Sequence, residues 1–224
     1  MATTRVHFQA EIEDFRSGLV EMASLVLAQV ERGVAAWEDV DRAAAAEVVE
    51  GDELVDQRCV ELDQKIFNLQ LLEAPVASDL RLLHVGLIGV IALERVGDLA
   101  VAIANAATSV RPEGADSTIQ AQISRMSAHA VDVLAQAVQA IARGDVALGE
   151  RARADAAGVR RMLDEVVQAV GALPSEELET RAWAAAAVLV ARHLERVANN
   201  GAELGGRVRF LVTGEPFTRD QAHS

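Results

Sequence analysis

Two pairs of acidic residues stand at nearly equal distances on either side of a predicted turn, and this arrangement strongly constrains the fold. Asp52 and Asp56 precede the turn around Pro75, and Glu94 and Asp98 follow it. A spacing of four residues places both acids of a pair on the same face of a helix. If the two helices fold back antiparallel, all four carboxylates meet at one level. We call this set the four-acid cluster.

Like charges at this density require compensation. At an effective dielectric constant near 20, each pair of carboxylates about 4–5 Å apart costs roughly 3–4 kcal/mol. A multivalent cation, shared protons or intervening water could each relieve that cost. An ordinary solvated acidic face is the alternative on a chain whose net charge is −13. Oxygen ligands would suit Mg²⁺, Mn²⁺, Ca²⁺ or iron better than a closed zinc site, which prefers Cys and His.

Apolar residues recur at helical intervals in six long stretches, and the alternation typical of strands is nearly absent. Phe8, Ile12, Phe15 and Leu19 begin such a stripe in the first stretch. The predicted helices cover residues 4–34, 39–72, 75–109, 117–143, 145–170 and 175–212. Proline, glycine and capping residues between 111 and 117 mark a break. The pattern therefore predicts an all-α protein.

The two halves repeat the same plan. Residues 93–96, Leu-Glu-Arg-Val, recur at 194–197, 101 residues later and at the same place in the third helix of each half. Because helix number and break positions also match, we infer an internal duplication that produced two pseudo-symmetric antiparallel three-helix bundles. The predicted division is residues 1–112 for the first bundle, 113–214 for the second and 215–224 for a polar tail.

Composition excludes several classes of function. The net charge of −13 argues against a nucleic-acid partner and against an anionic membrane surface. No stretch of about 20 residues is free of charge, so we expect no membrane insertion, and the N-terminus lacks a signal-peptide pattern. Cys59 is the single cysteine, which excludes an intrachain disulfide and fits a reduced cytoplasmic protein.

Three segments form a recognisable set: Ala-Pro-Val-Ala-Ser-Asp-Leu-Arg at 74–81, Glu-Arg-Val-Gly-Asp at 94–98 and Leu-Val-Thr-Gly-Glu at 211–215. Together they resemble the PhoU family of phosphate-uptake regulators. The resemblance covers nearly the whole chain and implies two similar three-helix bundles. It also implies a cytoplasmic negative regulator of phosphate uptake and phosphate-starvation signalling, without enzymatic activity. Such a protein would be a homodimeric adaptor between the importer's ATPase and a sensor histidine kinase.

The resemblance further implies metal clusters held by acids at four-residue spacing, with Fe, Mn, Mg or Zn as the divalent or trivalent ion. The four-acid cluster carries this pattern intact. The second half departs from it, because Glu195 is followed by Asn199 where an acid is expected. Asp155 is the candidate on the preceding helix, although Val159 stands four residues after it where a second acid is expected, and Glu150 is a possible substitute.

Two other functional hypotheses remain open at this point. One is a carboxylate-bridged metalloenzyme in a helical bundle, but no histidine follows a glutamate by three residues, so the Glu-x-x-His motif is absent. The other is a plain helical scaffold with solvated acids. A lesser hypothesis gives Asp79 and Arg81, at the start of the third helix, a direct contact with a partner. Trp37 and Trp183 are predicted to pack near the bundle ends.

Overall fold

The computed structural model describes residues 2–73, 75–173 and 177–217, which form six α-helices and contain no strand. The helices are α1 (Ala2–Glu38), α2 (Arg42–Glu73), α3 (Ala77–Ala106), α4 (Ser117–Arg143), α5 (Val146–Gly171) and α6 (Leu178–Thr213), with short 3-10 turns at Ala107–Ser109 and Pro112–Gly114. The predicted all-α class is confirmed. The third helix ends three residues earlier than expected because its last turn tightens into the first 3-10 segment. The predicted start of the sixth helix, at residue 175, lies outside the described residues.

Acidic caps and glycine stops explain where several helices begin and end. Asp41 caps α2, with Oδ1 accepting hydrogen bonds from backbone N–H groups two and three residues later at 2.9 and 3.0 Å. Asp116 and Asp145 cap α4 and α5 in the same way. Gly144 and Gly214 end α4 and α6 with φ angles of 66° and 81°. Glycine is favoured there because other residues rarely adopt a left-handed conformation.

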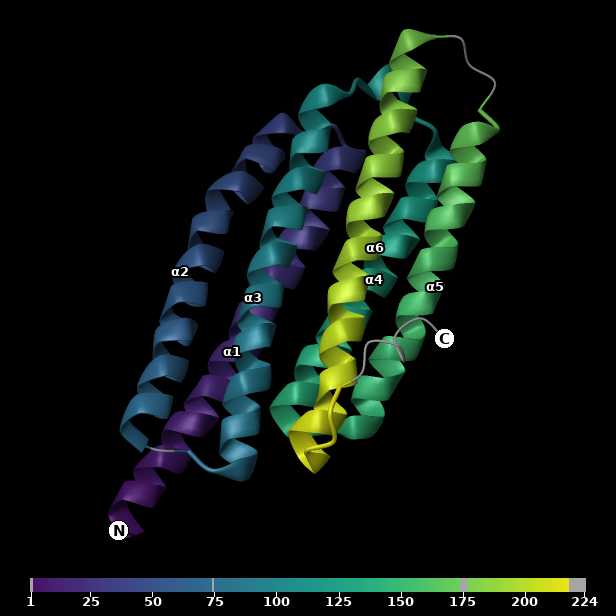
Figure 1. Ribbon diagram of the computed structural model, residues 1–224. Coiled ribbons are helices and arrows are strands. Elements are labelled where there is room, and N and C mark those ends of the chain that lie inside the picture. Colours follow the sequence, from purple (N-terminus) through teal and green to yellow (C-terminus); the bar gives the residue numbers. More distant parts are fainter. Residues whose placement is uncertain (1, 74, 174–176, 218–224) are drawn as a thin grey trace.

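The helices form two three-helix bundles that lie side by side (Figure 1). Helices α1, α2 and α3 pack together, as do α4, α5 and α6. The bundles meet where α3 packs on α6 and α1 packs on α4, so α2 and α5 lie at the outer edges (Figure 1). No helix within the described ranges has the length and apolar character needed to cross a lipid bilayer.

An aromatic stack joins the two bundles near one end. The rings of Trp37 on α1 and Trp183 on α6 lie 5.4 Å apart between centroids, with an interplanar angle of 23°. Both side chains are fully buried. The two tryptophans therefore pack near a bundle end, as predicted, and they do so against each other across the two halves.

Polar contacts between the bundles involve helix ends. Arg81 on α3 donates from Nε to the carbonyl oxygen of Leu211, at 3.0 Å, near the C-terminus of α6. Arg16 on α1 donates to the carbonyl of Ala142 at the end of α4. Positive side chains are favourable at these positions because helix C-termini carry partial negative charge.

The first residues of the predicted polar tail return to the second bundle. The ring of Phe217 lies against Gly206 on α6, and the guanidinium of Arg207 is 4.8 Å from the ring centroid. The rest of the tail is outside the described residues.

Candidate functional site

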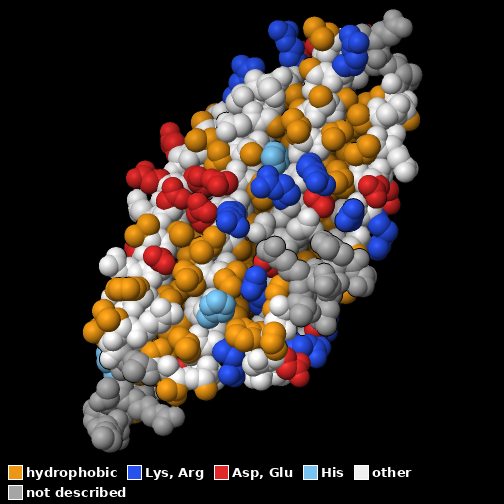
Figure 2. Space-filling view, viewed as in Figure 1, with side chains coloured by type: hydrophobic (Ala, Val, Ile, Leu, Met, Phe, Trp, Pro, Cys, Tyr) orange, Lys and Arg blue, Asp and Glu red, His pale blue; other side chains and the backbone are white. Residues whose placement is uncertain are grey.

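The α2–α3 hairpin carries the four-acid cluster on a solvent-accessible face. Val55 packs into the core between Asp52 and Asp56 on α2, and Val96 does the same between Glu94 and Asp98 on α3. Figure 2 shows acidic side chains gathered over the middle of these two helices. The sequence-based grouping of these acids therefore agrees with the structure.

Close helix approach at Gly97 helps to form this group. A Cβ atom at Gly97 would lie 2.9 Å from Oδ1 of Asp52 and 3.1 Å from a methyl carbon of Val55. The carboxylate of Asp52 thus occupies space that a larger residue at position 97 would fill. Glycine is needed at this position for packing, since its backbone has ordinary helical geometry.

Burial and neighbouring charges raise the pKa of two acids in the cluster, Asp52 and Glu94. Burial raises the pKa of Asp52, and the charges of Asp56, Asp98 and Glu94 raise it further. The pKa of Glu94 is also raised, chiefly by burial and then by Asp98 and Asp56, while Arg95 has a smaller opposing effect. Among the described residues, none of the four acids forms an ion pair. The cluster is therefore a region of concentrated negative charge without a direct ion-pair partner among the described residues.

The chemistry of the cluster fits a hard cation, because all its ligands would be carboxylate oxygens. The side-chain positions are more open than a coordination shell. Within the part of the chain that the structure describes, no three His, Cys, Asp or Glu side chains are placed to hold one ion. The acids come close enough to interact as charges, but they do not enclose a metal position.

The second half differs, because the burial pattern of α5 repeats that of α2 with an offset of 104 residues. The buried α2 residues Ala45, Val48, Val55 and Leu62 correspond to the buried α5 residues Gly149, Ala152, Val159 and Val166. The same offset aligns Asp52 with Ala156 and Asp56 with Arg160. The face of α5 that corresponds to the cluster thus offers a methyl group and a cation, and no acid.

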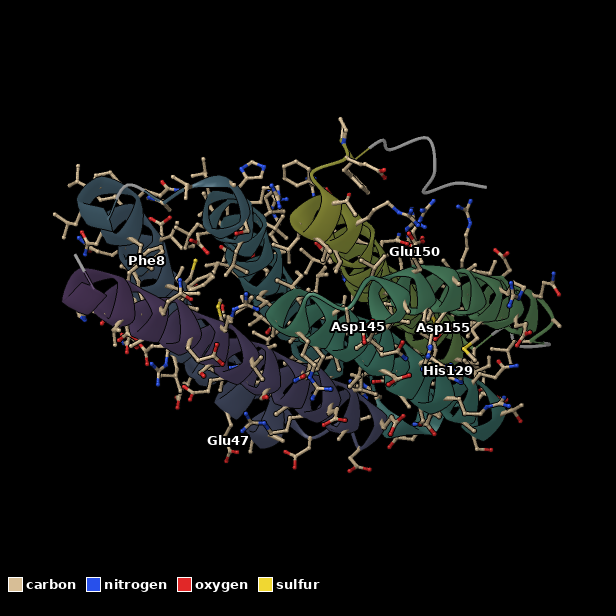
Figure 3. All side chains as sticks on the ribbon, turned by 90° about the horizontal axis from the view of Figure 1, so that it is seen from below. Phe8, Glu47, His129, Asp145, Glu150 and Asp155 are labelled. Atoms are coloured by element: carbon tan, nitrogen blue, oxygen red, sulfur yellow. The ribbon has the colours of Figure 1, made fainter. Side chains whose placement is uncertain are left out.

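Asp155 points to a different neighbour from the one expected. Gln136 on α4 donates a hydrogen bond from Nε2 to Oδ2 of Asp155 at 3.4 Å. The first half has the equivalent contact, in which Gln29 on α1 lies against Gly51. Asp155 therefore corresponds to Gly51 and faces α4, away from Glu195. Figure 3 shows Asp155 and Glu150 on different sides of α5.

The remaining second-half candidates have partners within the chain. Glu195 is only 5% exposed and pairs with Arg192 at 3.1 Å, while Asn199 Nδ2 donates to its Oε1 at 2.9 Å. Glu150 pairs with Arg209 at 3.1 Å. The structure therefore does not assemble Glu195 with Asp155 or Glu150. Sequence reasoning overlooked Arg160. The apolar residues of α5 recur every three or four positions, and this spacing could have indicated that Arg160 lies on the face toward α6.

The structure gives Arg81 a role within the chain. Its guanidinium donates to backbone carbonyls at the end of α6. Asp79 lies in the first turn of α3, where a negative charge is favourable. A partner contact through Asp79 and Arg81 stays a prediction.

The fold and the acidic hairpin define a class of duplicated three-helix-bundle proteins. Residues 19–107 and 123–208 each match the PhoU domain. The chain is 28% identical to the phosphate-specific transport system accessory protein PhoU homolog of Pseudomonas putida, over 92% of this chain and 81% of the relative. It is 25% identical to the PhoU accessory protein of Escherichia coli K12, over 94% and 87% of the two chains.

Solved structures of PhoU proteins also resemble this chain. The crystal structure of PhoU from Pseudomonas aeruginosa has a TM-score of 0.77 and 29% identity, covering 92% of this chain and 99% of that one. PhoU from Streptococcus pneumoniae shares the fold, with a TM-score of 0.83, 21% identity and coverage of 93% and 98%. The chain belongs to the PhoU family. This is a family of regulatory accessory proteins, and the chain is not an enzyme.

Proposed function

We propose that this protein is a cytoplasmic negative regulator of phosphate uptake and of phosphate-starvation signalling. The observation that carries the proposal is the pair of PhoU domains in one chain. Relatives named as accessory proteins of the phosphate-specific transport system align with it over more than four fifths of their length. The protein would act by binding, as an adaptor between the phosphate importer's ATPase and a sensor histidine kinase.

The charge distribution supports an adaptor whose two halves differ in net charge. Residues 1–112 contain 19 acidic and 9 basic residues, a net charge of −10, whereas residues 113–224 contain 15 and 12, a net charge of −3. Figure 2 shows acidic side chains over α2 and α3 and basic side chains beside them toward α6. Two surfaces of different charge could bind two different partners at once.

Loss of the gene tests the regulatory role. In phosphate-rich medium, a deletion strain should express phosphate-starvation genes that the parent keeps silent, and the wild-type gene should restore silence. Affinity purification from the native cells should recover the importer's ATPase and the kinase. Unchanged expression in the deletion strain, with neither protein recovered, would contradict the proposal.

A metal ion in the four-acid cluster is a further part of the proposal. Asp52, Asp56, Glu94 and Asp98 would hold it, and Fe, Mn or Mg would suit the oxygen ligands better than Zn. When bound, the ion would compensate the negative charge and stabilise the α2–α3 hairpin. The proposal is confined to the first half, because Glu195 is already paired and Arg160 occupies the position that corresponds to Asp56.

The Asp98→Asn variant tests the metal proposal. In metal-free protein the change should be neutral or slightly stabilising, because a like charge is lost. On adding Mn²⁺, the wild-type melting temperature should rise more than that of the variant, since stabilisation follows occupancy. Equal gains in both proteins would exclude Asp98 as a ligand. The converse variant Asn199→Asp should gain nothing from Mn²⁺, because the α5 positions that correspond to Asp52 and Asp56 hold Ala156 and Arg160.

A homodimer is the expected oligomeric state by family resemblance. Large apolar side chains such as Leu178 and Val212, which are 70% and 45% exposed, give the protein surface that association could cover. Light scattering should give twice the chain mass at micromolar concentration. A constant monomer mass across that range would contradict the expectation.

A further inference from the structure

An exposed apolar seam runs along α2 and α3 below the four-acid cluster. Val60, Gln64, Phe67 and Leu71 follow one another on α2 at spacings of four, three and four residues, and Leu80, His84, Leu87 and Ile91 do so on α3. This spacing keeps each row on one face of its helix. The side chains of Val60, Phe67, Leu71, Leu80 and Ile91 are between 40% and 66% exposed.

The two rows border a real depression. Val60, Asp63 and Phe67 from α2 and Leu87 and Ile91 from α3 line a groove of about 300 Å³. Figure 2 shows hydrophobic side chains along these helices, below the acidic group. We call this feature the α2–α3 groove. Soluble proteins rarely leave continuous apolar surface open to water unless something binds there.

Acidic groups close one end of the groove. One turn beyond Val60 on α2 is Asp56, and one turn beyond Ile91 on α3 is Glu94. Asp63 lines the groove itself. These acids also act on the interior of the groove, which Cys59 lines. The pKa of the Cys59 thiol is raised by burial and then by the charges of Glu94, Asp63 and Asp56. A ligand for this groove would be apolar along its length and positively charged at one end.

The second half does not repeat the two apolar rows. The offset of 101 residues places Arg181 and Arg192 at the positions of Leu80 and Ile91, and the offset of 104 places Gly171 at that of Phe67. Arg192 is 60% exposed and pairs with Glu195. Because the rest of the fold is duplicated, the apolar seam is a specific property of the first half.

We propose that the α2–α3 groove binds an amphipathic helix of a partner protein, with apolar residues along one face and Lys or Arg at the end that reaches the four-acid cluster. A groove between two antiparallel helices fits a third helix, and the described residues have no strand edge on which an extended peptide could pair. Residues 56–71 span about 22 Å, so the bound helix would be about 15 residues long. This inference rests on the proposed adaptor function and states the chemistry of one partner segment.

Synthetic peptides test the proposal with the full-length protein in EDTA. The first is a fluorescein-labelled 18-residue amphipathic helix with a leucine face and four arginines at one end; in the second, glutamates replace the arginines. Fluorescence anisotropy should show that the arginine peptide binds at least tenfold more tightly than the glutamate peptide, with an affinity that falls as salt is raised. Equal affinity of the two peptides would overturn the proposed charge preference.

Matched variants locate the binding surface. Phe67→Ser should weaken binding of the arginine peptide at least tenfold. Asp63→Asn should weaken it two- to fivefold and reduce its salt dependence. Leu189→Ser is the control, because Leu189 and Phe67 are each 59% exposed, and it should leave binding unchanged. Full affinity in Phe67→Ser would overturn the groove as the site.

Two further outcomes separate this inference from the proposed function. If sedimentation shows that Phe67→Ser converts a self-associated wild type into monomers, a second copy occupies the groove and the partner-helix proposal is wrong. If transport components copurify equally with wild type and Phe67→Ser, the adaptor function stands and the groove proposal falls. If the arginine peptide binds but no transport component copurifies with the wild type, the groove proposal stands and the adaptor function is contradicted.

Discussion

At the scale of single residues, Asp52 and Gly97 show how the acidic face is built. Asp52 lies over Gly97, where no Cβ atom competes for space, and it interacts with three other carboxylates. The resulting repulsion is a local cost to the folded state, and a proton or a cation can relieve it. The stability of the metal-free protein should therefore depend on the charge of this one residue.

We predict that Asp52→Asn stabilises the metal-free protein at neutral pH and that the gain disappears in acid. The pKa of Asp52 is raised by folding, so the folded state binds its proton more tightly than the unfolded state. The resulting stabilisation is complete below the unfolded pKa and is lost as the pH rises through the folded pKa. Thermal denaturation in EDTA from pH 4 to pH 8 should show a melting-temperature difference that grows with pH. Glu47→Gln, elsewhere on α2, is the control, and a pH-independent difference for Asp52→Asn would contradict the prediction.

The reactivity of Cys59 should report on the electrostatic field of the nearby acids. Cys59 is the single cysteine, so alkylation follows one thiol. Its pKa is raised by burial and then by Glu94, Asp63 and Asp56, which keeps the thiol protonated. Asp63→Asn should lower that pKa and increase the rate of iodoacetamide alkylation at pH 8 roughly two- to fivefold, since the thiolate is the reactive form. Mass spectrometry gives the rate. An unchanged rate at low ionic strength would show that these acids do not act on the thiol.

At the scale of helices, the ends of one bundle are completed by side chains of the other. Arg81 of α3 reaches the last turn of α6, and Gln120 of α4 donates to the carbonyl of Glu38 at the end of α1 at 2.9 Å. Such contacts satisfy carbonyl groups that have no partner within their own helix. They also fix how far each helix slides along its neighbour.

Replacing Arg81 should therefore destabilise the whole protein. Arg81→Met keeps the aliphatic stem but removes the guanidinium, and we expect a loss of about 1–2 kcal/mol in the free energy of unfolding. Urea denaturation followed by circular dichroism measures it. Arg42→Met, at the exposed start of α2, is the matched control and should change stability by less than about 0.5 kcal/mol. Equal effects of the two changes would argue against the role of Arg81 at the end of α6.

At the scale of the whole molecule, the two bundles share buried surface. Helix α3 packs on α6 and α1 packs on α4, so each bundle covers apolar residues of the other. Trp37 and Trp183 stack at this junction and are the only two tryptophans in the chain. Their fluorescence should therefore report directly on separation of the halves.

We predict that the halves unfold as one cooperative unit. Wild-type transitions followed by tryptophan fluorescence and by far-ultraviolet circular dichroism should coincide. Trp183→Leu should lower the unfolding free energy by about 2–4 kcal/mol, because it leaves unfilled space in a fully buried stack. Circular dichroism should still show one transition, shifted to lower urea. Two separate transitions in wild type would contradict cooperative unfolding.

The sequence alone determined the helices, their breaks and the duplication, because these depend on local signals. Apolar spacing, Asp116 and Asp145 as caps, and Gly144 as a stop act over a few residues. The four-acid cluster was also predictable, since a short turn between two long helices leaves little freedom in how they face each other. The distances of Asp52 and Asp98 from that turn then placed them together.

Only the tertiary structure decided which neighbour each helix face meets in the second half. A shift of one residue turns a side chain by about 100° around its helix, so Asp155 lies toward α4 while Ala156 takes the position that corresponds to Asp52. That rotation is set by how three helices share a core, and spacing along one helix does not reveal it. The partners of Arg81 were also decided by the tertiary structure. They are carbonyls about 130 residues away in the sequence, and only the packing of α3 on α6 brings them within reach.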